Sequence, residues 1–192
     1  MGIIFVPNAF AEITISDDAT GGDCASIGTW DSASRTCTFT SDLSESVVVG
    51  ANYLTLDGNG HTLDLGATSY NDVCQSYSSN YEERRAINFN AKTNLVIKNF
   101  TIKNFCVGMD FSNSISNSIL DNTMTNNYSS GMYIGNGNNN LISNNVFTNN
   151  VDNNNNWAIR LTGSQGFTIT ENTISASGDP SAYRHGIRVS LT

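Results

Sequence analysis

Arg160 and Arg188 occupy the same place in two similar segments of the sequence, AIRL and GIRV. A third segment, GMYI, has Tyr133 at that place, and His185 comes directly before GIRV. Guanidinium groups bind carboxylates through paired hydrogen bonds, and tyrosine or histidine can transfer a proton. These four residues are the best catalytic candidates. The arginines could neutralise a sugar carboxylate while Tyr133 or His185 acts as acid or base, as in lyase or epimerase chemistry.

These segments belong to a repeat that positions them. Five segments share the order small, apolar, polar, apolar at intervals of 22 to 28 residues: AINF (86–89), GMDF (108–111), GMYI (131–134), AIRL (158–161) and GIRV (186–189). Two columns of apolar residues follow, one of Ile97, Ile119, Ile142 and Ile169, the other of Ile102, Met124, Phe147 and Ile174. Apolar and polar residues alternate without a helical period, so each repeat is expected to contain three short strands.

Repeats of this length and pattern predict an all-β solenoid, a parallel β-helix with three short strands per coil and about five coils. One coil cannot bury its own apolar side chains, but coils stacked about 4.8 Å apart place like residues on one another. Asn122, Asn145 and Asn172 lie between the second and third strands, with Phe100 at the corresponding place in an earlier coil. Asparagine accepts left-handed backbone angles and its amide can bond to its copies, so we expect an asparagine ladder.

Three stretches resemble the right-handed parallel β-helix repeat family: NYLTLDGNGHTLDL (52–65), LVIKNFTIKNF (95–105) and LISNNVFTNN (141–150). That family has pectate-lyase-like members and many exported archaeal and bacterial proteins, and the resemblance covers residues 47–192. It implies a right-handed single-stranded β-helix. The resemblance also includes a copper-related periplasmic protein, but this chain has only two histidines, His61 and His185. Met109, Met124 and Met132 fall in apolar columns, so they are expected to lie in the hydrophobic core. We therefore expect no metal site and no cofactor.

The chain divides into three parts. Residues 1–11 are expected to be the remnant of a signal peptide, because an apolar run ends in the cleavage pattern Ala9-Phe10-Ala11; an ordinary first strand is the alternative. Residues 12–46 are expected to cap the open sheet edges at the amino-terminal end. Residues 47–192 form the β-helix, which we expect to be truncated at its carboxyl end and to be followed by further coils or a domain.

Four cysteines allow three disulfide pairings. Cys24 and Cys37 lie in the cap, whereas Cys74 precedes AINF and Cys106 precedes GMDF, one coil later. Because adjacent coils bring the last two together, Cys24–Cys37 and Cys74–Cys106 are the favoured pairs, and four free buried thiols are the alternative. Disulfides indicate an oxidising, extracytoplasmic location, secreted or at the cell surface.

Two asparagines stand in sequons and could be glycosylated on export. They are Asn99, followed by Phe-Thr, and Asn127, followed by Tyr-Ser. Asn127 is expected to lie in a loop, so it is the better acceptor of the two.

The strand that contains the repeated segment is expected to form the binding face. One outward column is polar: Asn88, Asp110, Tyr133, Arg160 and Arg188. The other is small and would form a shallow floor for an extended ligand: Ala86, Gly108, Gly131, Ala158 and Gly186. Loops of variable length lead into this strand and carry Tyr128, Trp157 and Tyr183. Their rings could stack on sugars or pack against the solenoid.

The two arginines of the polar column give a hint of the ligand. Stacked about 5 Å apart, Arg160 and Arg188 repel each other unless an anion offsets their charge, which suggests an acidic sugar. Two alternatives remain open at this stage. The guanidinium groups could pair with Asp152 or Asp179, or they could splay apart into water.

Composition limits the function. The formal net charge of −8 argues against a nucleic-acid partner, which requires a basic surface. No stretch reaches the roughly 18 apolar residues of a membrane span. We expect an exported module that binds a polysaccharide or cell-surface glycan or builds a surface structure. The alternatives are a polyuronate lyase or epimerase domain and an architectural spacer or adhesin stalk.

Overall fold

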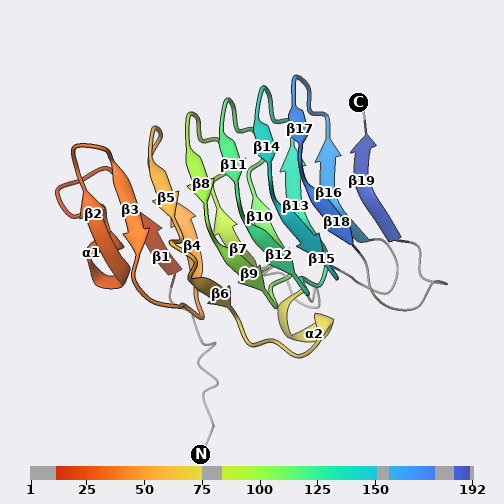
Figure 1. Ribbon diagram of the computed structural model, residues 1–192, viewed down its shortest axis with the longest axis horizontal. Coiled ribbons are helices and arrows are strands. Elements are labelled where there is room, and N and C mark those ends of the chain that lie inside the picture. Colours follow the sequence, from red (N-terminus) through yellow and green to blue (C-terminus); the bar gives the residue numbers. More distant parts are fainter. Residues whose placement is uncertain (1–11, 75–83, 151–155, 176–183, 191–192) are drawn as a thin grey trace, which may run out of the picture.

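The computed structural model describes residues 12–74, 84–150, 156–175 and 184–190. Within them the chain winds through three sheets that extend along one axis (Figure 1). Sheet A contains β1 (Glu12–Ile15), β4 (Ser46–Val49), β7 (Arg85–Asn88), β10 (Val107–Asp110), β13 (Ser130–Gly135), β16 (Asn156–Thr162) and β19 (Arg184–Ser190). Sheet B contains β2 (Gly28–Asp31), β3 (Thr36–Phe39), β5 (Thr55–Asp57), β8 (Val96–Lys98), β11 (Ser118–Leu120), β14 (Leu141–Ser143) and β17 (Thr168–Thr170). Sheet C contains β6 (Thr62–Asp64), β9 (Thr101–Lys103), β12 (Thr123–Thr125), β15 (Val146–Thr148) and β18 (Thr173–Ser175).

Successive strands visit sheets A, B and C in turn, so β4, β5 and β6 form the first full coil and β16, β17 and β18 the fifth. Neighbouring coils pair in parallel, and the predicted columns are in register: Ile97 pairs with Ile119, and Ile119 with Ile142. β19 then adds a further strand to sheet A. The expectation of an all-β parallel β-helix with three short strands per coil and about five coils is thereby confirmed.

The core is one continuous column of apolar side chains inside the three sheets. The central residue of each short strand points inward, and Ile97, Ile119 and Ile142 are fully buried. Phe89 stacks on Phe111 of the next coil with ring centroids 4.7 Å apart. Each such side chain contributes roughly 1.5–3 kcal/mol on burial, but only when the neighbouring coil covers it, so the coils stabilise one another.

The predicted asparagine ladder is present. Asn122 accepts a hydrogen bond from the Phe100 N–H and donates to Asn145, which donates to Asn172; the two side-chain bonds are both 3.0 Å long. Two further ladders, which the sequence reasoning missed, join Asn117 to Asn140 and Asn127 to Asn150. These amides lie at the turns between sheets and bond to backbone groups that the strands leave unpaired.

A second set of asparagines serves the turns through the backbone. Asn99, Asn104, Asn126, Asn144 and Asn149 all have φ between 52° and 62°. Asparagine tolerates this left-handed region better than most residues other than glycine. The abundance of asparagine therefore has two separate causes: inward amide ladders and left-handed turns.

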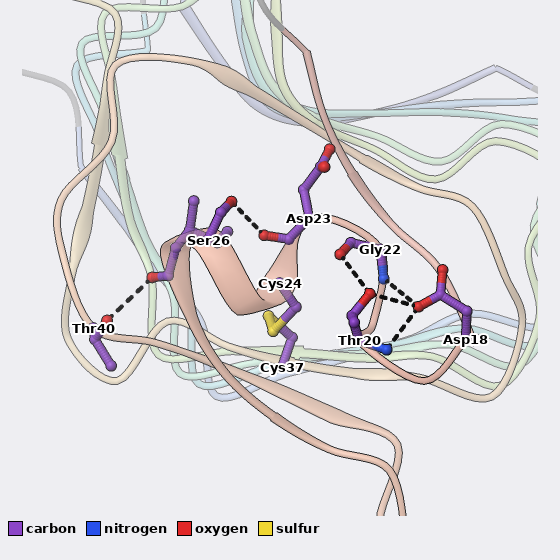
Figure 2. The surroundings of a disulfide bond; sticks show 9 residues. Asp18, Thr20, Gly22, Asp23, Cys24, Ser26, Cys37 and Thr40 are labelled. Atoms are coloured by element: carbon purple, nitrogen blue, oxygen red, sulfur yellow. Dashed lines mark hydrogen bonds between the residues drawn. A yellow bond between two sulfur atoms is a disulfide. The ribbon is translucent and has the colours of Figure 1, made fainter.

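The amino-terminal segment lies at the end of the stack next to the first coil. β1 pairs with β4 of sheet A, and β2 pairs antiparallel with β3 at the edge of sheet B. The short helix α1 (Cys24–Ile27) is joined to β3 by the Cys24–Cys37 disulfide (Figure 2). Beside it, the Asp18 carboxylate accepts hydrogen bonds from Gly22 and Thr20. The Gly22 N–H, followed by the Ser16 hydroxyl and the Thr20 groups, lowers the pKa of Asp18 far below its usual value.

An insertion between β6 and β7 carries α2 (Tyr70–Val73), which projects from one side of the stack (Figure 1). The Cys74–Cys106 disulfide fixes α2 to the start of β10. Both disulfides are the predicted pairs. Val73, Cys74, Cys106 and Val107 form a small buried group here, which we call the insert cluster. Among the described residues, no helix is long and apolar enough to cross a membrane.

Candidate functional site

The outer face of sheet A brings three of the predicted site residues together. Tyr133 on β13 pairs with Arg160 on β16, and Arg160 pairs with Arg188 on β19. Side chains alternate along a strand, and the preceding residues Met132 and Ile159 are fully buried in the core. The column of Tyr133, Arg160 and Arg188 therefore faces outward, across three successive coils.

Aromatic rings hold the two guanidinium groups. The Cζ atom of Arg160 lies 5.1 Å from the centroid of the Tyr133 ring and 5.0 Å from that of the Trp157 ring. The Cζ atom of Arg188 lies 4.8 Å from the Trp157 centroid. Each contact is a cation–π interaction worth roughly 0.5–2 kcal/mol, depending on exposure. The rings stabilise two like charges next to each other, but they do not neutralise them.

No carboxylate among the described residues pairs with either arginine. Four other cations do form ion pairs: Arg35 with Asp17, Arg85 with Asp110, Lys98 with Asp57, and Lys103 with Asp64. Within the described residues, Arg188 donates from its Nε to the Ser190 hydroxyl, at 3.3 Å. The Nε of Arg160 is buried without a hydrogen-bond partner in the described part of the chain. The alternative partners Asp152 and Asp179 lie outside the described residues.

A surface pocket adjoins this cationic pair. It has a volume of about 310 Å³ and is lined by Trp157, Ile187, Arg188 and Val189. The side chain of Arg188 is exposed, whereas that of Arg160 is half-buried. A ligand can therefore reach both guanidinium groups from the solvent, and it can contact apolar surface beside Arg188.

The expectation that Asp110 presents a carboxylate to a ligand is wrong. Asp110 is only 2% exposed and forms an ion pair with Arg85, which precedes the repeated segment on β7. Its Oδ1 also accepts a hydrogen bond from the Ser112 hydroxyl, at 3.1 Å. The sequence reasoning missed Arg85, although an arginine next to a column that holds an aspartate was a usable signal. Asn88 is half-buried and accepts a hydrogen bond from the Asn90 N–H, at 3.2 Å.

Two of the aromatic residues expected on loops, Trp157 and Tyr128, are described by the structure, and neither offers a free ring to a sugar. Trp157 lies in β16, is 5% exposed and has the two guanidinium groups over its ring. Tyr128 is half-buried, packs on the insert cluster and donates its hydroxyl to the Ala67 carbonyl at 2.9 Å. Neither ring therefore has a free face on which a sugar could stack. Tyr183 and the side chain of His185 lie outside the described part of the structure.

The small residues were assigned to the wrong side of sheet A. Ala86 and Ala158 belong to the core, and Gly108 and Gly131 are buried as well. A Cβ added to Gly131 would lie 2.7 Å from the Phe147 ring and 2.7 Å from the Ala158 carbonyl oxygen, so a larger residue does not fit there. The column that faces outward is the preceding one, which includes Arg85, Val107 and Trp157. Gly186 is exposed on the last strand, β19.

The choice of Asn127 as a glycosylation acceptor is also wrong for the folded protein. Its side chain is fully buried, and its Nδ2 donates to the Ile102 carbonyl and to Asn150. Both amide hydrogens are thus engaged, and no enzyme can reach them. Asn99 is half-buried and donates to Asp57, at 2.9 Å. Its glycosylation stays a prediction.

Fold, disulfides and location together define the class of protein: an exported parallel β-helix. The family model that matches residues 34–189 is NosD, described as periplasmic copper-binding protein. The chain belongs to this family of right-handed parallel β-helices, and the match gives no specific support to a pectate-lyase-like assignment. No curated protein matches the chain. A periplasmic family and two disulfides agree with the predicted extracytoplasmic location.

The residues of this chain do not fit the copper site that the family description implies. All four cysteines are in disulfides, and Met109, Met124 and Met132 are fully buried in the core. Of the two histidines in the sequence, His61 bonds to Asp42 at 3.2 Å. No group of three or more histidine, cysteine or acidic side chains in the described residues could hold a metal ion. Copper prefers thiolate, thioether and imidazole ligands, and the described residues present no exposed set of them.

Proposed function

We propose that this exported β-helix protein binds an acidic polysaccharide on the outer face of sheet A, with Arg160 and Arg188 holding its carboxylate groups. One observation carries the proposal. The two arginines are adjacent in register, fixed by aromatic rings, and without a carboxylate partner among the described residues. Like charges that stand side by side are destabilising, so an arrangement that fixes them favours an anionic ligand.

The geometry suits planar oxyanions on an extended chain. The Cζ atom of Arg160 lies over the Tyr133 and Trp157 rings and its Nε is buried, so the terminal amino groups of this half-buried side chain are left for a ligand. Two terminal amino groups can donate two parallel hydrogen bonds to one carboxylate. Neighbouring strands lie about 4.8 Å apart, so the two arginines could bind anionic groups that are separated by this distance along the axis. A polysaccharide that runs along the solenoid supplies such groups from successive sugars.

The distribution of charge supports the same ligand. The whole chain has a formal net charge of −8, which repels a polyanion at long range. Elsewhere in the described residues, Arg35, Arg85, Lys98 and Lys103 are compensated by aspartates. Arg160 on β16 and Arg188 on β19 form no such pair among the described residues, although they stand side by side in register. A spacer that only extends along the surface gains nothing from such a feature.

Binding is tested with purified protein and soluble polysaccharides: polygalacturonate and alginate as acidic probes, dextran as a neutral one. Affinity electrophoresis compares the unaltered protein with the double variant Arg160→Ala/Arg188→Ala. The matched control is Lys98→Ala/Lys103→Ala, which removes the same charge from sheets B and C. The proposal requires that the affinity for the acidic probes falls at least tenfold in the arginine variant and not in the lysine variant. Equal loss in both variants would mean that net charge alone drives binding.

The same samples separate the binding role from the alternative as a lyase or epimerase domain. Release of unsaturated products would favour the enzyme, with Tyr133, Arg160, Arg188 and His185 as its candidates. Absence of binding and of turnover by folded protein would favour an architectural spacer or adhesin stalk.

A further inference from the structure

The turn between sheets A and B contains a left-handed residue in every coil. In coils two to five these residues are Asn94, Ser116, Asn139 and Gly166, with φ between 54° and 66°. In the first coil the residue is Tyr53, with φ of 59°. Backbone bonds from Tyr53 to Thr93 and from Asn94 to Ile115 align the positions. Small or polar residues suit this backbone, whereas a large aromatic side chain makes it strained.

A second left-handed residue contacts Tyr53. Arg35 has φ of 53°, and its Cζ atom lies 5.9 Å from the centroid of the Tyr53 ring. Its guanidinium forms a two-point ion pair with Asp17, at 3.1 and 2.6 Å, and donates to the Asn52 carbonyl at 2.8 Å. The arginine is therefore held rigidly beside the ring. Two strained residues in direct contact need a common explanation.

Core packing does not supply that explanation. Tyr53 is 58% exposed, the largest value among the exposed large hydrophobic residues of the described structure. A single exposed ring is ordinary on a protein surface, but an exposed ring on a strained backbone is not. Asparagine, as in Asn94, would remove the strain and would cost no core contact. Strain that the fold does not require is typical of a site that contacts a ligand.

We infer that Tyr53, Arg35 and Asp17 form a second binding site, for a neutral sugar ring, on the first coil. The open face of the Tyr53 ring offers an apolar platform, and the Asp17 carboxylate beside it is 43% exposed and can accept hydrogen bonds from hydroxyl groups. Because Asp17 already compensates Arg35, the site has no preference for an anion, unlike the pair of Arg160 and Arg188. The surroundings of the ring are polar, whereas a protein partner requires a broader apolar patch.

Tyr53→Asn tests this inference because strain and binding should change in opposite directions. The probes are dextran, mannan and xylan, measured by affinity electrophoresis, together with the thermal midpoint Tm. We expect the unaltered protein to bind at least one probe. Tyr53→Asn should lose that binding at least tenfold while its Tm rises by about 2 °C or more, since relief of about 1 kcal/mol of strain shifts Tm by that amount in a domain of this size.

Two controls make the outcome specific. Tyr53→Phe keeps the ring and should keep the binding, and Arg160→Ala/Arg188→Ala should bind the neutral probes as before. Binding of no probe by the unaltered protein would overturn the inference, as would unchanged binding by Tyr53→Asn. A lower Tm for Tyr53→Asn would also overturn it, because the ring would then be structural. Self-association that depends on Tyr53 would identify a contact between protein copies in place of a sugar site.

Discussion

Removal of the central rung of the asparagine ladder should destabilise the protein far more than removal of its end. The Nδ2 of Asn145 donates to the carbonyls of Ile119 and Ser143, at 2.9 Å each, and to Asn172 at 3.0 Å. Its Oδ1 accepts from the N–H and the Nδ2 of Asn122, at 3.0 Å each. The Asn145 side chain is fully buried, so water cannot replace these bonds after Asn145→Ala.

The magnitude follows from the groups left without partners. Asn145→Ala orphans the buried Asn122 N–H and at least one acceptor of the Asn145 amide. Each unsatisfied buried group costs about 1–3 kcal/mol, so we expect a loss of about 3–4 kcal/mol. That is a large share of the 5–15 kcal/mol typical of a domain. Asn172 is half-buried at the end of the ladder, and water can reach its site, so Asn172→Ala should cost about 1 kcal/mol.

Urea unfolding followed by circular dichroism measures both free energies of unfolding. Asn144→Gly is the matched control, because Asn144 is an exposed turn residue with φ of 56° and glycine keeps that backbone. It should change the free energy of unfolding by less than 1 kcal/mol. Equal losses for Asn145→Ala and Asn172→Ala, or a loss below 1 kcal/mol for Asn145→Ala, would refute the view that buried amides hold the coils together.

Three further predictions concern the site, acid stability and copper. Cys74→Ser/Cys106→Ser should weaken acidic-polysaccharide binding several-fold in affinity electrophoresis, because Tyr133 packs on the insert cluster and also on Arg160; unchanged affinity would contradict this link. Burial raises the pKa of Asp57, but hydrogen bonds from Asn99 and Asn59 and the Lys98 charge outweigh it and lower that pKa. The stabilisation by Asp57 is therefore present above the unfolded pKa of about 4 and is lost as the pH falls through the folded value. The difference in Tm between the unaltered protein and Asp57→Asn should shrink below about pH 4. A difference in Tm that stays constant from pH 7 to 3 would contradict this prediction. Titration calorimetry with Cu(I) and Cu(II) should show no stoichiometric high-affinity binding; a one-to-one site would contradict the assessment of the donor set.

The fold was predictable because stacking constrains inward residues strictly. Ile97, Ile119 and Ile142 had to recur at one position, since each covers the next at the spacing of parallel strands. The ladder of Asn122 and Asn145 was visible for the same reason. Asn127 was misplaced because it was assigned to a loop of variable length, whereas its amide bonds to Asn150 of the next coil in a third ladder.

The face of sheet A was only partly predictable. Period-two alternation was extended backward from Tyr133 to Gly131, which placed the small residues outside. The strand ladder pairs Val107 with Ser130 and Met109 with Met132, without a bridge between Gly108 and Gly131. This irregularity turns both glycines toward the core, so alternation fails at that point. The ion pair of Arg85 with Asp110 joins neighbouring strands of this sheet, and the proximity of the two residues in the repeat was the signal that alternation alone left unused.

Residues that depart from the repeat are consequently the most informative ones in this protein. Isoleucine on isoleucine and asparagine on asparagine need no explanation beyond the stacking of coils. Two arginines in register do need one, since proximity of like charges opposes folding and only a ligand or a carboxylate offsets it. Tyr53 needs one as well, because its column otherwise contains asparagine, serine and glycine. Both exceptions lie on the outer surface, where stacking imposes no identity, and the two proposed sugar sites, one acidic and one neutral, would account for them.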